Sequence, residues 1–283
     1  MFKMKNNFLR KSFVLSWMGL FIIISSLKAQ PLKLMSLNVR YDNPSDGKNA
    51  WIYRKEAIAH WIGDSIQPDV VCLQEVLHHQ LEYLQEQWKE RYDHFGVGRE
   101  DGKMKGEYSP IFYDKSRFEF IKGETLWLSD TPQIPSKGWD AACERIVTAL
   151  YLKDKKFQDT LCVFNTHWDH VGSVARLKSA DVLLRLYASL PAHYSFFCAG
   201  DFNAQDHEES IEKLLEHWRD LSSDNPIQQP TFTGFQDQIP DAKRIDYLWA
   251  RKRDERKCLF HQVRGAHGVS FLSDHDVIWV EIR

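Results

Sequence analysis

The 283-residue chain has few cysteines and no excess of positive charge. It holds 37 Lys and Arg against 39 Asp and Glu, a net charge of −2, with five cysteines. Without a strongly basic field the whole chain is not suited to coating a long nucleic acid, although a local basic patch remains open. Five cysteines at this length do not make a disulfide scaffold. Cys72, Cys162 and Cys198 lie in apolar runs and are expected to be buried, which leaves Cys143 and Cys258 as candidates for pairing.

The sequence also lacks internal repeats, low-complexity tracts and an interdomain linker. Its first segment joins basic residues to an apolar core from 13 to 24, followed by the small residues that precede Ala29. This order is typical of a secretory signal peptide cleaved near Ala29. A retained membrane anchor is the alternative, but the apolar core is short and no stop-transfer flank follows it. No cysteine sits near the cut, which argues against a bacterial-type lipid anchor.

Cleavage would leave residues 30–283 as one catalytic domain of 254 residues, after a signal peptide at 1–29. The first 29 residues hold five basic and no acidic residues, so the remainder carries 32 basic against 39 acidic residues, about −7. We therefore expect a secreted or periplasmic protein of bacterial type, monomeric and without a stable membrane anchor.

Strand patterns outnumber helix patterns along the chain. Strands are predicted at 32–39, 69–75, 92–97, 109–113, 118–128, 145–152, 160–165, 194–199, 244–250, 258–263 and 277–282. Helical spacing favours helices beginning near 51 and 77, and at 173–189 and 208–218. Helices separate some strand pairs but not all of them. This mixture predicts an α/β fold of two packed mixed sheets flanked by helices, a four-layer sandwich.

One stretch, Phe197–Ala204, brings an acid and an amide to the end of a buried strand. Asp201 and Asn203 lie two residues apart, so in an extended chain both point away from Phe202. A carboxylate beside a neutral amide can hold a divalent cation and a phosphate oxygen together. An Asx turn leading into a helix is the simpler alternative.

Polar residues end other predicted strands as well. Glu75 follows five uncharged residues, and a carboxylate in such a place needs a partner. Asp246 stands in an apolar strand, and Asp274 and His275 stand side by side at the head of the last strand. A buried acid bonded to a histidine fixes its tautomer and raises its basicity, so we pair Asp246 with His275. Such ends can converge on one edge of a sheet, where carboxylates favour Mg²⁺ or Mn²⁺.

The stretch Asn165–His170 contains His-x-Asp-His, part of a signature of dizinc hydrolases of the metallo-β-lactamase type. That signature requires histidine where this chain has Asn165. The dizinc interpretation is therefore disfavoured.

Six motifs occur in one order, and together they resemble the endonuclease/exonuclease/phosphatase family. They are Leu37-Asn38, Gln74-Glu75, Asn165-Thr166-His167-Trp168-Asp169, Gly200-Asp201-Phe202-Asn203, Arg244-Ile245-Asp246-Tyr247 and Ser273-Asp274-His275. The resemblance covers residues 32 to 283 and implies a four-layer sandwich, in agreement with the strand and helix patterns. Each motif is weak alone, whereas the ordered series is specific.

The resemblance implies a role for each matched residue. Glu75 would be the principal Mg²⁺ ligand, with Asn38 and Asp274 beside it. Asp201 would orient the attacking water or hold a second metal, and Asn203 would bind a phosphate oxygen. His275, backed by Asp246, would act as base or stabilise charge.

Two further assignments rest on the same resemblance. Glu107 would support His167, which would protonate the leaving group or hold the phosphate. Arg145 sits where members of the family place an arginine that faces the phosphate, so Arg145, Asn38 and Asn203 are the expected substrate-binding residues. Trp168 replaces a residue that is usually aliphatic.

The expected activity is Mg²⁺-dependent hydrolysis of a small or lipid-derived phosphodiester, by in-line attack of water. The alternative is a DNA or RNA nuclease that uses the same site. A nuclease could use a basic patch at Arg91, Arg99, Lys103 and Lys105, and base-stacking aromatics among Trp51, Trp139, Trp168 and Phe235. These aromatics could equally be core residues, which we expect of Trp51. A third hypothesis, a binding module without catalysis, would require the loss of a chemical residue, and none is missing.

Overall fold

The computed structural model describes residues 31–223, 225, 229–238 and 242–283. The predicted signal peptide, residues 1–29, lies outside this range. Residues Pro31–Arg283 form one compact unit. No helix in the described part of the chain is long and apolar enough to span a membrane.

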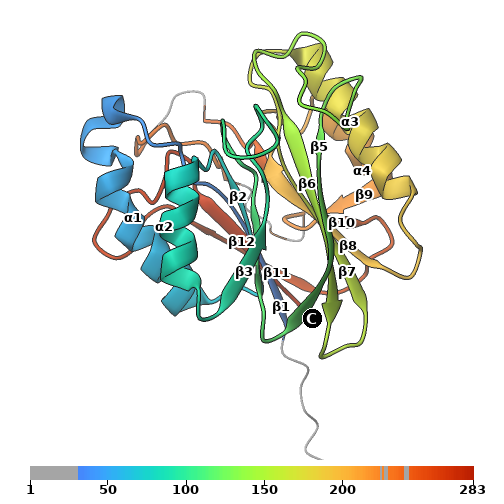
Figure 1. Ribbon diagram of the computed structural model, residues 1–283, viewed down its shortest axis with the longest axis horizontal. Helices are drawn as coiled ribbons and strands as arrows, with labels where there is room; N and C mark the ends of the chain where they lie inside the picture. The colour runs from blue at the N-terminus through green and yellow to red at the C-terminus, as the bar shows by residue number, and fades with distance from the viewer. Residues whose placement is uncertain (1–30, 224, 226–228, 239–241) are drawn as a thin grey trace, which may run out of the picture. The chain divides into compact units, whose positions relative to one another are not determined.

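The unit contains two mixed β-sheets of six strands each (Figure 1). In spatial order, the first sheet holds β11 (Cys258–Val263), β12 (Val277–Ile282), β1 (Leu32–Asn38), β2 (Val70–Gln74), β4 (Ile111–Asp114) and β3 (Tyr92–Phe95). The second holds β5 (Phe118–Trp127), β6 (Ile146–Asp154), β7 (Thr160–His167), β8 (Ser195–Asp201), β10 (Asp246–Arg251) and β9 (Trp218–Asp220). In each sheet one central pair is parallel, β1 with β2 and β7 with β8.

Helices cover the outer face of each sheet. The first sheet carries η1 (Pro44–Asn49), α1 (Trp51–His60), η2 (Trp61–Ile66) and α2 (His78–Trp88) on its side of the molecule. The second carries α3 (Ser173–Ala188) and α4 (Glu209–His217). Figure 1 shows these helices outside the two sheets, which face each other. The predicted four-layer sandwich is confirmed.

Strand alternation assigns the apolar side chains to three cores. In β2, Val71 and Leu73 pack against the helices, whereas Val70 and Cys72 point between the sheets. In β7, Phe164 packs toward α3, and Val163 points between the sheets. The core between the sheets is therefore built from every second residue of the central strands.

The predicted strands are all present, with ends shifted by at most two residues, and one local expectation is wrong. The helix predicted to run through Trp218 ends at His217, and Trp218 begins the edge strand β9 because its backbone pairs with β10. The strand predicted from Arg145 begins at Ile146. Cys143 and Cys258, the candidates for pairing, are not joined to each other by a disulfide.

Candidate active site

The core between the sheets turns polar at one end. Following the alternation, the inward row of β1 runs from Leu32 and Leu34 to Ser36 and Asn38. The inward rows of the neighbouring strands end in the same way, on Gln74, Asn165, His167 and Asp201. Above this end lies a cavity of about 470 Å³. It is lined by Arg40, Tyr41, Glu75, Arg99, Glu107, Cys143, Arg145, His167, His170, Asp201, Asn203, Phe232, Lys243, Ile245, Asp274 and His275.

Glu75 reaches the cavity because its backbone leaves the strand geometry. By alternation it would point toward the helices, as Leu73 does, but its φ of +58° lies in the left-handed region. Its Oε1 accepts a hydrogen bond from Asn38 Nδ2 at 2.9 Å, and its Oε2 accepts one from the Tyr41 amide at 3.1 Å. A strained backbone is thus held in place at a predicted metal ligand.

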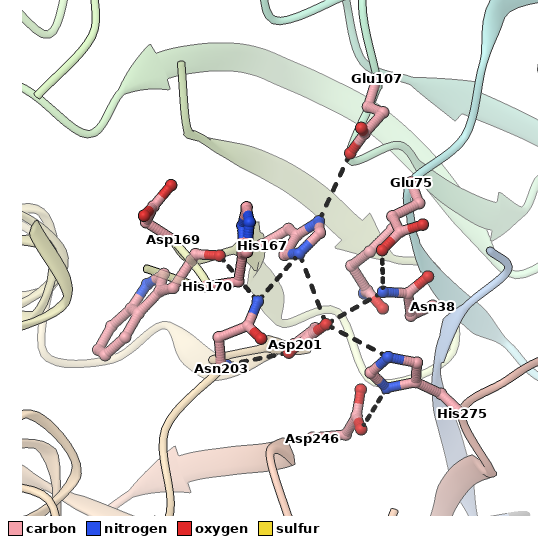
Figure 2. A network of polar contacts seen from close by, with 12 residues as sticks. Asn38, Glu75, Glu107, His167, Asp169, His170, Asp201, Asn203, Asp246 and His275 are labelled. Carbon is pink, nitrogen blue, oxygen red and sulfur yellow. Dashed lines mark hydrogen bonds and ion pairs between the residues drawn. The ribbon is translucent and has the colours of Figure 1, made fainter. Parts of the chain in front are cut away.

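Asp201 is the centre of the polar network (Figure 2). Its Oδ1 accepts the Asn203 amide at 2.9 Å, and its Oδ2 accepts Asn38 Nδ2 at 3.0 Å. The same Oδ2 lies 3.5 Å from His167 Nε2 and 3.6 Å from His275 Nε2. Burial, with a further contribution from the Asp246 charge, raises the pKa of Asp201 to about 7.

Asp246 and His275 form the predicted pair. Asp246 Oδ2 lies 2.8 Å from His275 Nδ1, and both residues are buried. Burial works against a charged imidazole, but the carboxylates of Asp246 and Asp201 outweigh it and raise the pKa of His275 well above its usual value. His275 therefore presents a positive charge beside Asp201.

His167 lies near Glu107, but Glu107 has a stronger partner. Arg99 binds Glu107 with both terminal nitrogens, at 2.6 and 2.8 Å, whereas His167 Nδ1 lies 3.7 Å from Glu107 Oε2. Burial and the charges of Arg145 and Arg99 hold the pKa of His167 well below its usual value. Neutral His167 faces Asn203 Nδ2 at 3.2 Å with its Nε2, and Asn203 also donates to the Trp168 carbonyl at 3.0 Å.

Arg145 is held at the cavity wall by the segment that follows His167. Its Nε donates to Asp169 Oδ2 at 3.2 Å, and its Nη2 lies 2.9 Å from His170 Nδ1. Its Nη1 is buried without a hydrogen-bond partner among the described residues. An unsatisfied guanidinium nitrogen at the wall of a cavity is suited to an anionic ligand.

Asp274 lies on the opposite wall. Its Oδ1 accepts from Ser273 Oγ at 3.1 Å, and its Oδ2 lies 3.7 Å from Arg40 Nε. Arg40 binds mainly to Asp46, at 3.0 and 3.1 Å. Burial and the nearby charge of Glu75 raise the pKa of Asp274.

The donors fit a hard divalent cation in part. The ligand atoms of Glu75, His167 and Asp201 lie within 4.8 Å of one another, as do those of Asp201, Asp246 and His275. Carboxylates crowded in this way would be neutralised by a divalent ion. The predicted ligand Asn38 turns its nitrogen toward Glu75 and Asp201, and its Oδ1 accepts the Arg40 amide at 2.9 Å, so it would have to flip to present oxygen.

The motifs left several cavity residues unidentified. Arg40, Tyr41, His170 and Lys243 line the cavity without having been predicted as site residues. Arg40 and Tyr41 lie two and three residues after Asn38, and His170 ends the Asn165–His170 stretch, so proximity to a motif was the available signal. Lys243 directly precedes the Arg244-Ile245-Asp246-Tyr247 motif, so the same signal applies to it.

The predicted basic patch and stacking aromatics are mostly not assembled. Arg91 binds Asp114 at 2.8 Å at the other end of the first sheet, and Arg99 is paired with Glu107. Trp51 is core, as expected. Trp168 is also fully buried and packs edge-to-face on Phe202, with ring centroids 4.7 Å apart.

Comparison with known proteins places this geometry in a family. Residues 35–275 match the model of the Endonuclease/Exonuclease/phosphatase family. A crystal structure of an endonuclease/exonuclease/phosphatase from Bacteroides vulgatus is 34% identical, with a TM-score of 0.81 over 89% of this chain and 98% of that one. The mannosyl-6-phosphatase Bt3783 of Bacteroides thetaiotaomicron is 29% identical, with a TM-score of 0.80 over 89% and 99%.

More distant structures share the fold. D. rerio TDP2 complexed with single-strand DNA product is 19% identical, with a TM-score of 0.70 over 89% of this chain and 98% of that one. The family predicted from the six motifs is confirmed by the match over residues 35–275. This chain therefore belongs to the endonuclease/exonuclease/phosphatase family, whose members are metal-dependent hydrolases of phosphoester bonds.

Proposed function

We propose that this protein is an exported, Mg²⁺-dependent phosphoesterase that hydrolyses a small or lipid-derived phosphodiester. The observation that carries the proposal is the position of Asp201. One of its oxygens lies within 3.6 Å of two imidazoles and bonds to Asn38, at the base of a cavity lined by arginines. Mg²⁺ held by Glu75 and Asp274, with Asn38 if its amide flips, would supply Lewis-acid stabilisation of the phosphoryl oxygens.

The protein's own side chains would carry out proton transfer and stabilise the developing charge. Asp201, with a pKa raised to about 7, is matched to accept a proton from water near neutral pH. Charged His275 and the Asn203 amide would stabilise the negative charge that develops on the phosphoryl oxygens. Arg145 lines the cavity, and its guanidinium would bind another oxygen of the substrate. Neutral His167 completes the wall next to Asn203.

Substitution of two residues tests the proposal. Asp201→Ala or His275→Ala should each lower kcat by roughly 10³-fold, because each removes a group that acts on the transition state. The free energy of unfolding should fall little in Asp201→Ala, whereas His275→Ala also breaks the buried pair with Asp246, so kcat is measured well below the unfolding temperature of each variant. Asp154→Asn is the matched control, since Asp154 is a buried acid paired with Arg117 at the opposite end of the strands. Undiminished activity in the two site variants, or full activity in the presence of a chelator, would refute the proposal.

A sugar phosphomonoester is the second candidate substrate. The 29% identical neighbour is named a mannosyl-6-phosphatase, and a cavity of about 470 Å³ suits a small molecule. A panel with Mg²⁺ separates the candidates: bis(p-nitrophenyl) phosphate, sphingomyelin, mannose 6-phosphate, inositol phosphates, RNA and plasmid DNA. Turnover of mannose 6-phosphate alone would replace the diester proposal. Preference for DNA or RNA with strongly salt-dependent binding would favour the nuclease alternative.

We propose export because residues 1–29 begin with basic residues, continue with an apolar core and end with small residues. Expression of the full chain in a bacterial host, followed by N-terminal sequencing of the protein outside the cytoplasm, tests it. The expected first residue is Gln30. An intact N-terminus on protein that remains in the membrane would favour the retained anchor.

A further inference from the structure

The two sheets contribute different halves of the site. Asn38 ends β1, Glu75 directly follows β2, and Asp274 and His275 lie in the loop that leads into β12, all in the first sheet. His167, Asp201, Asn203 and Asp246 belong to β7, β8 and β10 of the second sheet or their ends. Contacts such as Asp246 with His275 therefore depend on how far apart the sheets stand. Most of the core between them is apolar.

Directly beneath the site, two buried amides join the sheets. Gln74 Nε2 donates to Asn165 Oδ1 at 2.7 Å, and Asn165 Nδ2 donates to the carbonyls of Leu73 and Pro110 at 2.7 and 2.9 Å. Ser36 Oγ accepts a further hydrogen bond from Gln74 Nε2 at 3.1 Å. Gln74 and Asn165 are both 0% exposed. Asn165 of the second sheet thus bonds to β2 and to the residue before β4 in the first.

Burying the amides of Gln74 and Asn165 has a free-energy cost that apolar side chains in the same positions would avoid. Buried amides must be desolvated, and Gln74 Oε1 has no hydrogen-bond partner among the described residues. The neighbouring inward positions, such as Cys72 and Val163, are apolar and fill the same layer. Hydrogen bonds are directional, whereas apolar contacts tolerate sliding, so the amides specify a spacing that apolar side chains would leave free.

The position along the strands links this spacing to the reaction. Gln74 immediately precedes Glu75, and Asn165 lies one inward position before His167. A second polar bridge between the sheets lies at the opposite end, where Arg117 binds Asp69 at 2.9 Å and Asp154 at 2.9 Å. The amide bridge adjoins the cavity residues, where Asn38 also bonds to Asp201 and His275 to Asp246, whereas the Arg117 bridge lies far from them.

We propose that Gln74 and Asn165 are positioning residues that set the separation of the two half-sites. The proposal rests on the phosphoesterase function proposed above. Neither amide is expected to touch substrate. Their loss would let the ends of β2 and β7 move apart by fractions of an ångström, which misaligns Asp201 and His275 against groups held by the other sheet.

The test compares the two bridges. Asn165→Leu and Gln74→Met remove the amide bridge with similar side-chain volume, and Arg117→Gln weakens the distant bridge. The amide variants should lower kcat by roughly 10- to 100-fold at temperatures well below unfolding, with KM changed little. Arg117→Gln should lower Tm and leave kcat close to that of the wild type. An Asn165→Leu protein with unchanged kcat would overturn the proposal.

Two further measurements distinguish a positioning role from a general loss of stability. In Asn165→Leu, amide hydrogen exchange should become faster at the ends of β2 and β7. If the variant were only less stable, exchange would become faster throughout the protein, and that result would also overturn the proposal. The double variant Gln74→Asn with Asn165→Gln restores the summed side-chain length and should recover part of kcat. The exchange measurement needs no substrate. If the wild type hydrolysed none of the esters, the proposed function would be refuted, while hydrogen exchange would still test the positioning role of Gln74 and Asn165.

Discussion

At the scale of single residues, the sequence predicts which side chains form the site better than it predicts their partners. Strand ends and motif order identify Glu75, Asp201 and His275, because a polar residue at the end of an apolar strand is a local property of the sequence. Partner choice depends on distant segments. Glu107 was expected to support His167, yet it binds Arg99 at 2.6 and 2.8 Å, and no local pattern encodes that preference.

Asp169 gives a pH-dependent prediction at this scale. Burial alone would raise its pKa, but the amides of Gly172, Ala142 and Val171, together with Arg145, lower it from 3.8 to about 2. A group with a depressed folded pKa stabilises the protein above its unfolded pKa, and this stabilisation is lost as pH falls from about 4 to about 2. Asp169→Asn should therefore destabilise the protein at pH 7, by about 3 kcal/mol for a broken buried pair.

The difference in free energy of unfolding between wild type and Asp169→Asn should be constant above about pH 5 and shrink below about pH 4. Urea titrations at several pH values measure it. Asp140→Asn is a suitable control, because Asp140 is exposed and bonds to nearby amides without a buried arginine. A difference that does not change down to pH 3 would show that the charge of Asp169 is not responsible.

At the scale of elements, the patterns predict nearly every strand but not where each one bends. The run ending in Glu75 was expected as one strand, whereas β2 stops at Gln74 and the left-handed φ of Glu75 redirects its side chain. Trp218 fits a helical pattern, but edge pairing with β10 makes it a strand residue. In both places tertiary contacts override local preference, and the first of them builds the site.

The strands β7 and β8 approach each other closely at Gly200. A Cβ at this position would lie 2.1 Å from the Thr166 carbonyl oxygen, and the strands pair Thr166 with Gly200 and His167 with Asp201. Gly200→Ala should therefore push the two strands apart beneath the site. We expect a loss of about 1–3 kcal/mol in the free energy of unfolding.

Gly200→Ala should also lower kcat. The control is Ser195→Ala at the start of β8, where the hydroxyl bonds to Asp159 far from the cavity, and its kcat should fall less. Thermal melts and steady-state kinetics of both variants measure the two effects. Gly200→Ala with wild-type Tm and kcat would mean that the strands tolerate the methyl group.

At the scale of the whole molecule, the layered fold could be predicted, but the exact strand order could not. Two sheets and flanking helices follow from the count and alternation of patterns. The order β11-β12-β1-β2-β4-β3 brings the last strands of the chain beside the first, and no local signal specifies this neighbour. That pairing places Asp274 and His275 next to Asn38, so the site exists only in the folded chain.

A site assembled in this way should link metal binding to folding. Glu75 and Asp274, the proposed Mg²⁺ ligands, come from distant segments, and burial raises the pKa of Asp274. A divalent ion that binds only the folded arrangement stabilises it, by about 2.7 kcal/mol at 100 times its dissociation constant. Mg²⁺ should therefore raise Tm, and a chelator should reverse the rise, independently of any substrate. Glu75→Gln should weaken the response, while Glu209→Gln on exposed α4 should retain it. If Mg²⁺ and Mn²⁺ both leave the wild-type Tm unchanged over a wide concentration range, these carboxylates do not form a metal site in the folded protein.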